Sequence, residues 1–245
     1  MTAGRTRVRW WGDRDAGPVV ALVPGLGLPS YVAPTARALA ARGWACAVLD
    51  LPGFGAPGAL VCAPQVEQVG AATAEWTRRL PPGRPLVLLG HSTGAQSALA
   101  AALAVQDERP DAALALAGPT FAPGQRGLLR LAAATATAYR EDSLREAVVL
   151  PELLRGHARV AAYVVSGVRD RPEERIRDLR LPLLLTAGRA DTYAPASWLE
   201  QLASAASASP QVVTRLLGGS HNNLFTHGDD LAATVVGTGL YRATR

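Results

Sequence analysis

The chain has 245 residues, of which 49% are hydrophobic and 18% are charged, and its formal net charge is +5. This length suits one large domain with a well-buried core, and the composition excludes a disordered chain. No apolar run approaches the roughly 20 residues that span a bilayer, and the arginines are dispersed rather than gathered into basic runs with interleaved aromatic residues. We therefore expect no membrane partner and no nucleic-acid partner.

The N-terminal stretch and the cysteine content indicate a cellular location. Residues 1–11 lack the apolar core of a signal peptide. The two cysteines, Cys46 and Cys62, have no histidine or cysteine neighbours that would suggest a metal site. Both features favour a cytoplasmic protein without a metal ion.

The first half of the chain alternates strand-like and helix-like segments. Short apolar runs bounded by turn residues predict strands, and segments with apolar residues on one face predict helices. The expected strands cover residues 8–11, 19–23, 44–49, 86–89 and 112–116, and the expected helices cover residues 34–42, 64–80 and 93–107. Such alternation is typical of a doubly wound α/β domain, which has a parallel sheet with helices on both faces.

From residue 121 to about residue 180 the alternation stops. Helices are expected at residues 127–140, 143–155 and 158–168, with Pro151 near the end of the second. A helical insertion this long cannot lie within a sheet, so we expect a core of residues 1–120 and 181–245 and a helical cap of residues 121–180 above the strand ends. After the insertion, strands are expected at residues 183–187 and 212–216, and helices at residues 197–207 and 229–236.

The stretch from Leu86 to Gln96 places Ser92 between Gly90 and Gly94, directly after an apolar run. The apolar run has the length of a buried strand, and the alanine-rich segment that follows predicts a helix. The backbone must turn from strand to helix within a few residues, which strains the serine and projects its hydroxyl group. The pattern predicts a nucleophile elbow, although Gly-x-Ser-x-Gly alone also fits an ordinary glycine-bounded turn.

A serine nucleophile needs a base within hydrogen-bond reach and a carboxylate that orients the base. Of the four histidines, only His221 lies in a loop just after an expected strand, whereas His91 precedes Ser92 and is expected to point away from it. The same test selects Asp191; Asp50 begins a Pro-Gly turn and is expected to cap local N–H groups. The order Ser92, Asp191, His221 predicts a catalytic triad, the alternatives being a turn aspartate and a loop histidine bonded to backbone.

An acyl-transfer site also needs two donors for the developing oxyanion. One expected donor is the backbone N–H of Thr93, the residue after the nucleophile, and the other is the N–H of Leu26 in a glycine-rich loop. The alternative for Leu26 is that its N–H only completes a turn. Phe121 and Tyr193 flank expected strand ends and are candidates for substrate contact.

These motifs together resemble the α/β-hydrolase fold superfamily, in its single-domain form with a helical cap. The matching motifs are Pro24-Gly25-Leu26-Gly27, Asp50-Leu51-Pro52-Gly53-Phe54-Gly55, Gly90-His91-Ser92-Thr93-Gly94, Gly188-Arg189-Ala190-Asp191 and Gly219-Ser220-His221-Asn222. The resemblance implies a mostly parallel sheet of about eight strands, an all-helical cap inserted between two late strands, and neither metal nor organic cofactor. In two departures, Pro24 stands where the family often has a histidine, and Ala56 where it often has a polar residue.

The sequence therefore predicts a serine hydrolase. The expected reaction is hydrolysis, through a Ser92 acyl-enzyme, of an ester, thioester or lactone of a small and largely apolar molecule, because the expected cap is rich in leucine, alanine and valine and offers no charge cluster. Two alternatives stay open. The same residues resemble those of carbon–carbon bond hydrolases, cofactor-free haloperoxidases or perhydrolases, and lyases, and the scaffold could also serve a non-catalytic ligand-binding protein.

Overall fold

A computed structural model describes residues 7–127 and 144–240 of the chain. The described residues form a sheet of seven strands in the order β1-β3-β2-β4-β5-β6-β7, and only β1 pairs antiparallel to its neighbour. The strands are β1 (Arg7–Trp11), β2 (Val19–Val23), β3 (Ala45–Asp50), β4 (Leu86–His91), β5 (Ala112–Ala117), β6 (Leu183–Gly188) and β7 (Val212–Leu217). The described residues thus hold seven strands, where the family resemblance implied about eight, and the mostly parallel sheet is confirmed.

Both faces of the sheet are covered, as the nearly continuous apolar strands require. Along β2, Val19, Ala21 and Val23 pack into one core, whereas Val20 and Leu22 pack into the other. This alternation follows from the two-residue period of a strand. Ligands of such sheets bind outside the carboxyl ends of the strands.

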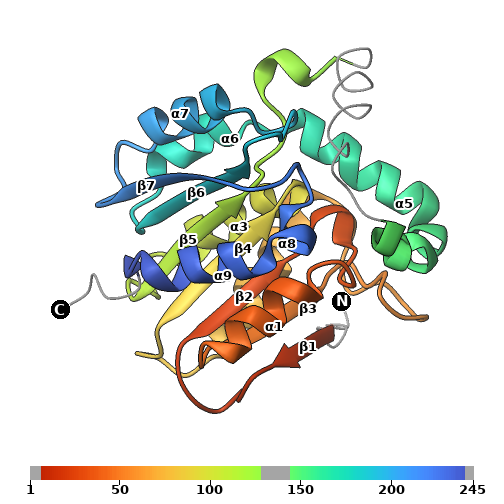
Figure 1. Ribbon diagram of the computed structural model, residues 1–245, viewed down its shortest axis with the longest axis horizontal. Coiled ribbons are helices and arrows are strands. Elements are labelled where there is room, and N and C mark those ends of the chain that lie inside the picture. Colours follow the sequence, from red (N-terminus) through yellow and green to blue (C-terminus); the bar gives the residue numbers. More distant parts are fainter. Residues whose placement is uncertain (1–6, 128–143, 241–245) are drawn as a thin grey trace.

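The helices complete the two layers. They are α1 (Ala33–Ala41), α2 (Val66–Arg78), α3 (Thr93–Val105), α7 (Ala196–Ala205), α8 (Asn223–Thr226) and α9 (Gly228–Gly237). Figure 1 shows α1 and α9 in front of the sheet and α3 behind it, in agreement with the two cores. Every core helix and strand expected from the sequence is present, with bounds shifted by a few residues. The short helix α8 is an addition.

The chain between β5 and β6 departs from the sequence prediction. Its described part contains the 3-10 helices η2 (Pro123–Gln125), η3 (Leu144–Val149) and η4 (Ile176–Asp178), and the α-helices α5 (Leu150–Arg169) and α6 (Pro172–Arg175). The expected helix at residues 127–140 lies outside the described residues, apart from Gly127.

The two helices expected at residues 143–155 and 158–168 correspond to the 3-10 helix η3 followed by α5, and the backbone of α5 is non-helical at His157, where φ is 22° and ψ is −103°. The break between the two expected helices therefore falls where the sequence placed it. Pro151 lies in the first turn of α5 and not near the end of a helix. Proline fits this place because its missing N–H has no partner within the helix. Within the described ranges, no helix has the length and apolarity needed to cross a membrane.

Candidate active site

Ser92 stands at the turn between β4 and α3. Its φ of 56° and ψ of −128° lie in a region that side-chain-bearing residues rarely adopt, and its N–H donates to Ala117 O at 3.1 Å. Such strain persists only where the surrounding structure holds it. Ser92 Oγ consequently faces a cavity at the carboxyl ends of the strands.

The glycines on either side of Ser92 allow two close backbone contacts. A Cβ atom on Gly90 would lie 2.4 Å from Gly94 O, and a Cβ atom on Gly94 would lie 2.3 Å from Val23 O. Both separations are too short for a side chain. The Gly-x-Ser-x-Gly pattern therefore reflects a packing requirement of the strand–turn–helix.

Two loops bring His221 and Asp191 to the same end of the sheet. His221 Nε2 is 3.0 Å from Ser92 Oγ, and His221 Nδ1 is 3.1 Å and 3.0 Å from the two carboxylate oxygens of Asp191. A carboxylate only accepts, so Nδ1 carries the proton of a neutral ring and Nε2 can accept from Ser92. The three residues selected from the sequence thus form one hydrogen-bonded series.

Asp191 is 4% exposed and still favours the charged form. Burial alone would raise the pKa of Asp191, but the charge and hydrogen bond of His221 and the N–H groups of Ala194 and Tyr193 outweigh it and hold that pKa below its usual value. The two N–H groups donate to Asp191 Oδ1 at 3.0 and 2.8 Å. The carboxylate is therefore held on three sides and ionised at neutral pH.

The two expected oxyanion donors lie next to each other but differ in their hydrogen bonding. Thr93 begins α3, where N–H groups have no partner within the helix. Leu26 has a φ of 55°, and its N–H donates to the side-chain hydroxyl of Thr93 at 2.8 Å. The structure thus brings Leu26 and Thr93 together, with the Leu26 N–H engaged by a side chain.

His91 has partners that the sequence did not indicate. Its Nε2 is 2.9 Å from the carbonyl oxygen of His221, and its Nδ1 is 2.6 Å from the hydroxyl of Tyr31. Burial, and then the nearby His221, lower the pKa of His91 to about 3, so the ring is neutral. Because a carbonyl only accepts, Nε2 carries the proton and Nδ1 accepts from Tyr31. Residue spacing gave no signal for this pairing.

Tyr193 and Phe121, the two candidates for substrate contact, lie beside His221. The Tyr193 ring packs edge-on against the His221 imidazole with centroids 4.8 Å apart, and Phe121 packs against Tyr193 at 6.1 Å. Neither belongs to the described lining of the cavity beside Ser92. Val164 and Val168 of α5 also pack against this pair of rings.

A mainly apolar cavity of about 350 Å³ opens beside Ser92. Its described lining consists of Gly25, Leu26, Leu28, Tyr31, His91, Ser92, Ala147, Val149, Leu150, Leu153, His221 and Asn222. The apolar side chains come from the glycine-rich loop, from η3 and from the start of α5. Few polar groups face the cavity apart from those around Ser92, which suits a largely apolar ligand.

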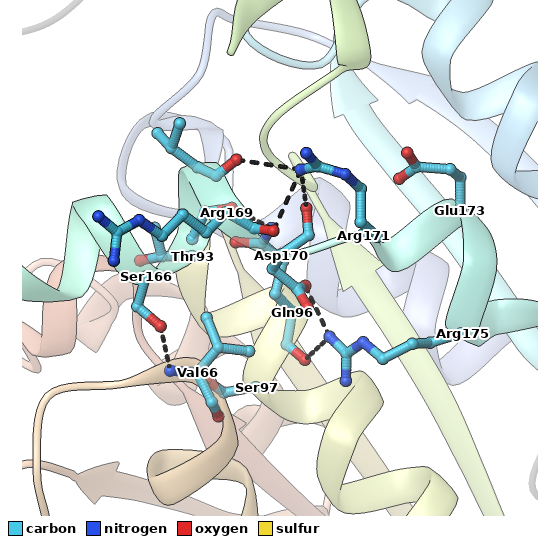
Figure 2. A network of polar contacts seen from close by, with 12 residues as sticks. Val66, Thr93, Gln96, Ser97, Ser166, Arg169, Asp170, Arg171, Glu173 and Arg175 are labelled. Carbon is cyan, nitrogen blue, oxygen red and sulfur yellow. Dashed lines mark hydrogen bonds and ion pairs between the residues drawn. The ribbon is translucent and has the colours of Figure 1, made fainter.

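Polar contacts hold α5 on the elbow helix. Figure 2 shows Arg175 between the carboxylate of Asp170 at the end of α5 and the carbonyl oxygen of Gln96 in α3, at 2.6 and 3.3 Å. The Gln96 amide donates back to Gly167 O at 2.9 Å, and the Ser166 hydroxyl accepts from the first N–H of α2. The second half of α5 is thereby tied to the helix that begins at Thr93.

Two other sequence predictions concern residues outside the series. Asp50 Oδ1 accepts from Gly55 N–H at 2.9 Å, which is the turn-capping role expected for it. Among residues 7–127 and 144–240, no group of three or more His, Cys, Asp or Glu side chains is arranged to hold a metal ion.

Comparison with known proteins identifies the family. A model described as "Alpha/beta hydrolase family" matches residues 20–234. No curated protein matches the sequence significantly.

Many solved structures share the fold. A thioesterase domain from the curacin biosynthetic pathway is 20% identical, with a TM-score of 0.68 and 94% of each chain covered. The enol-lactonase from Burkholderia xenovorans LB400 is 21% identical, with a TM-score of 0.67 and 95% of each chain covered. A lipase-esterase related protein from Clostridium acetobutylicum ATCC 824 is 13% identical, with a TM-score of 0.76, over 96% of this chain and 99% of that one. Because the family model spans most of the sequence and the fold agrees with it, the chain belongs to the alpha/beta hydrolase family of enzymes.

Proposed function

We propose that this enzyme is a serine hydrolase that cleaves an ester, thioester or lactone of a small, largely apolar molecule. The observation that carries the proposal is the series Ser92 Oγ, His221 and Asp191, joined by contacts of 3.0 to 3.1 Å. A nucleophile, a base and an orienting carboxylate in that geometry are what acyl transfer through a serine requires.

In the proposed acylation step, His221 Nε2 takes the Ser92 proton while Oγ bonds to the acyl carbon. The carbonyl oxygen becomes an oxyanion, and the imidazolium is stabilised by Asp191. When the tetrahedral intermediate collapses, the bond to the leaving group breaks and His221 returns the proton to that group. Water then attacks the acyl-enzyme with His221 as base, which releases the acid and restores the Ser92 hydroxyl.

The N–H of Thr93 is the first oxyanion donor that we assign, because it lies at the free N-terminal end of α3. The second is the N–H of Leu26. In this role Leu26 shares its hydrogen between Thr93 Oγ1 and the oxyanion, or turns from one to the other. The left-handed backbone at Leu26 is a strained conformation of the kind that accompanies functional loops.

The substrate class follows from the cavity. A volume of about 350 Å³ suits a small molecule, and the side chains of Leu28, Val149 and Leu153 would contact an alkyl or alkenyl group. The proposal extends to the domain organisation: residues 121–180 form a cap on a core of residues 1–120 and 181–245. Its support is that the start of α5 lines the cavity beside Ser92.

Replacement of Ser92 by alanine tests the proposal. The turnover rate of p-nitrophenyl butyrate should fall by about 10³-fold or more relative to the native enzyme. Any remaining rate above the uncatalysed reaction would come from substrate binding and the oxyanion donors. The control is Ser209→Ala, which removes a hydroxyl that only contacts the carbonyl oxygens of Leu181 and Gln211 and should leave turnover unchanged.

Labelling with a fluorophosphonate gives an independent result. The label should appear on Ser92 in the peptide map of the native enzyme and should be lost in Ser92→Ala. Unchanged ester turnover in Ser92→Ala would refute the assigned nucleophile. A native protein that neither turns over esters nor reacts with the label would instead be a ligand-binding member of the family.

A further inference from the structure

The loop that carries Leu26 lacks a side-chain anchor at its first residue. Pro24 precedes Gly25 and offers no hydrogen-bonding group. A different side chain contacts the loop: the hydroxyl of Tyr31 accepts a hydrogen bond from Gly25 N–H at 2.7 Å. Tyr31 is 5% exposed, and a Cβ atom on Gly25 would lie 2.9 Å from its hydroxyl oxygen. The fit between hydroxyl and loop therefore depends on glycine at this position.

The same hydroxyl is the centre of a longer series of hydrogen bonds. It accepts from Gly25 N–H and donates to His91 Nδ1 at 2.6 Å, and His91 Nε2–H donates to the carbonyl oxygen of His221 at 2.9 Å. Each donor in this series has one acceptor, so the directions are consistent from end to end. The His91 and His221 rings also lie against each other, with centroids 5.0 Å apart.

We propose that Tyr31 and His91 form a positioning relay that ties the loop bearing Leu26 to the loop bearing His221, with the Tyr31 hydroxyl anchoring Gly25 at the start of the first loop. The inference rests on the proposed function, because it assigns a task within that same site. Neither residue bonds to Ser92 Oγ in the structure, and neither is assigned a proton-transfer step.

The physical reason lies in the two ends of the relay. Gly25 packs so closely on Ser92 that a Cβ atom would lie 2.8 Å from the Ser92 Cβ, so a shift of its peptide displaces the neighbouring Leu26 N–H. At the other end, the carbonyl of His221 belongs to the residue whose ring must contact both Ser92 and Asp191. Sub-ångström displacement of such groups lowers the rate more than it lowers substrate binding.

Tyr31→Phe tests the relay because it removes only the hydroxyl. The expected result with p-nitrophenyl butyrate is a fall in kcat of about tenfold or more with KM changed less than about threefold, since the loop acts mainly on the transition state. The rate of fluorophosphonate labelling should fall in parallel. A native kcat in a folded Tyr31→Phe protein would overturn the proposal.

Thr73→Val is the matched control. Thr73 is fully buried in α2, and its hydroxyl donates to Val69 O of the same helix at 2.8 Å, outside the relay. Its loss should lower the melting temperature as Tyr31→Phe does, because both variants remove a buried hydrogen bond, but kcat should stay within about twofold of the native value. An equal loss of kcat in both variants would mean general loosening and would contradict the relay.

A measurement on the native protein covers the case in which Tyr31→Phe does not fold. Long-range ¹H–¹⁵N correlation spectra of enzyme with ¹⁵N-labelled histidine should place the His91 proton on Nε2. Nδ1 should carry no proton and should accept a hydrogen bond. A proton on Nδ1 alone would refute the relay.

The two proposals can fail independently. If Ser92→Ala abolishes turnover but Tyr31→Phe does not change it, only the relay fails. An active Ser92→Ala protein refutes the proposed function itself.

Discussion

At the scale of single residues, the site depends on charges and protons held in defined places. Asp191 is buried, yet the His221 contact and two backbone N–H groups hold its pKa below the usual value. A carboxyl group of this kind adds stability above the pKa it has in the unfolded chain, and that stability is lost as pH falls through its lower folded value. The same interactions that keep Asp191 charged also orient His221.

Asp191→Asn should show what this carboxylate contributes. The asparagine oxygen can still accept from Tyr193 and Ala194, but an amide N–H facing His221 Nδ1 would favour the tautomer with the proton on Nε2, where it cannot accept from Ser92. We expect kcat/KM for p-nitrophenyl butyrate to fall by about 10³- to 10⁴-fold.

The control for that measurement is Asp50→Asn. Asp50 also lies at the carboxyl end of a strand, but its carboxylate caps Gly55 N–H, and an asparagine oxygen can accept the same bond. Its kcat/KM should stay within about threefold of the native value. Equal losses in the two variants, or an active Asp191→Asn enzyme, would contradict the assignment of Asp191.

At the scale of elements, α5 is attached to the core at both ends. Near its start, Glu152 accepts from the N–H and hydroxyl of Ser30, and Arg155 donates to the carbonyl oxygen of Phe54 at 3.0 Å. Beyond the kink at His157, the contacts with Gln96 hold its second half (Figure 2). These contacts hold α5 in place, and the start of α5 lines the cavity.

A paired arginine and glutamate connect the residues after β5 to α6. Arg126 donates to both carboxylate oxygens of Glu173 at 2.7 Å. Burial alone would raise the pKa of Glu173, but the Arg126 hydrogen bonds and nearby positive charge outweigh it and keep that pKa below its usual value. The pair therefore stabilises the fold above the unfolded-state pKa of glutamate and loses this effect as pH falls through the lower folded value.

Glu173→Ala should lower the free energy of unfolding by about 1–2 kcal/mol at pH 7, because it leaves the half-buried guanidinium of Arg126 without its carboxylate partner. The difference from the native protein should shrink as the pH falls below the unfolded-state pKa of glutamate and through the lower pKa that Glu173 has in the folded protein. Urea denaturation at several pH values measures this. Asp107→Ala breaks the exposed pair with Arg180 and should cost less than about 0.5 kcal/mol; a pH-independent loss in Glu173→Ala would rule out the ion pair as its cause.

At the scale of the whole molecule, the cavity exists because separate parts of the chain meet above the carboxyl ends of the strands. The glycine-rich loop, the elbow, the start of α5 and the loop after β7 each contribute to its lining. None of these segments encloses a space by itself. Under the proposed function we expect substrate size to be set where α5 approaches the sheet, and Leu153 lines the cavity at that place.

Leu153→Trp should narrow the range of accepted substrates. The added ring volume would fill part of the cavity, so kcat/KM for p-nitrophenyl octanoate should fall at least about tenfold, while that for the acetate changes less than about threefold. Leu154→Trp is the matched control, because Leu154 is 75% exposed and is not in the described lining. An unchanged chain-length profile in Leu153→Trp would place the acyl group elsewhere.

The sequence by itself determined the α/β framework and the identity of the three residues that meet at Ser92. Apolar runs with a two-residue period specify buried strands, and parallel strands place their carboxyl ends at one edge, so residues that follow strands can be assigned to a common site. The three side chains named in this way lie within 3.1 Å of one another in series. The spacing of Gly90 and Gly94 predicted the nucleophile elbow, because only glycine allows the close backbone contacts seen at these two positions.

Only the tertiary structure decided the engagement of Leu26 N–H by Thr93 and the link from Tyr31 through His91 to His221. Each depends on contacts between residues distant in the chain. Thr93 is 67 positions from Leu26, and His91 is 130 positions from His221. Local patterns of hydrophobicity and turn residues record which elements form, but the partner of a buried hydroxyl or imidazole is chosen by the packing that brings the elements together.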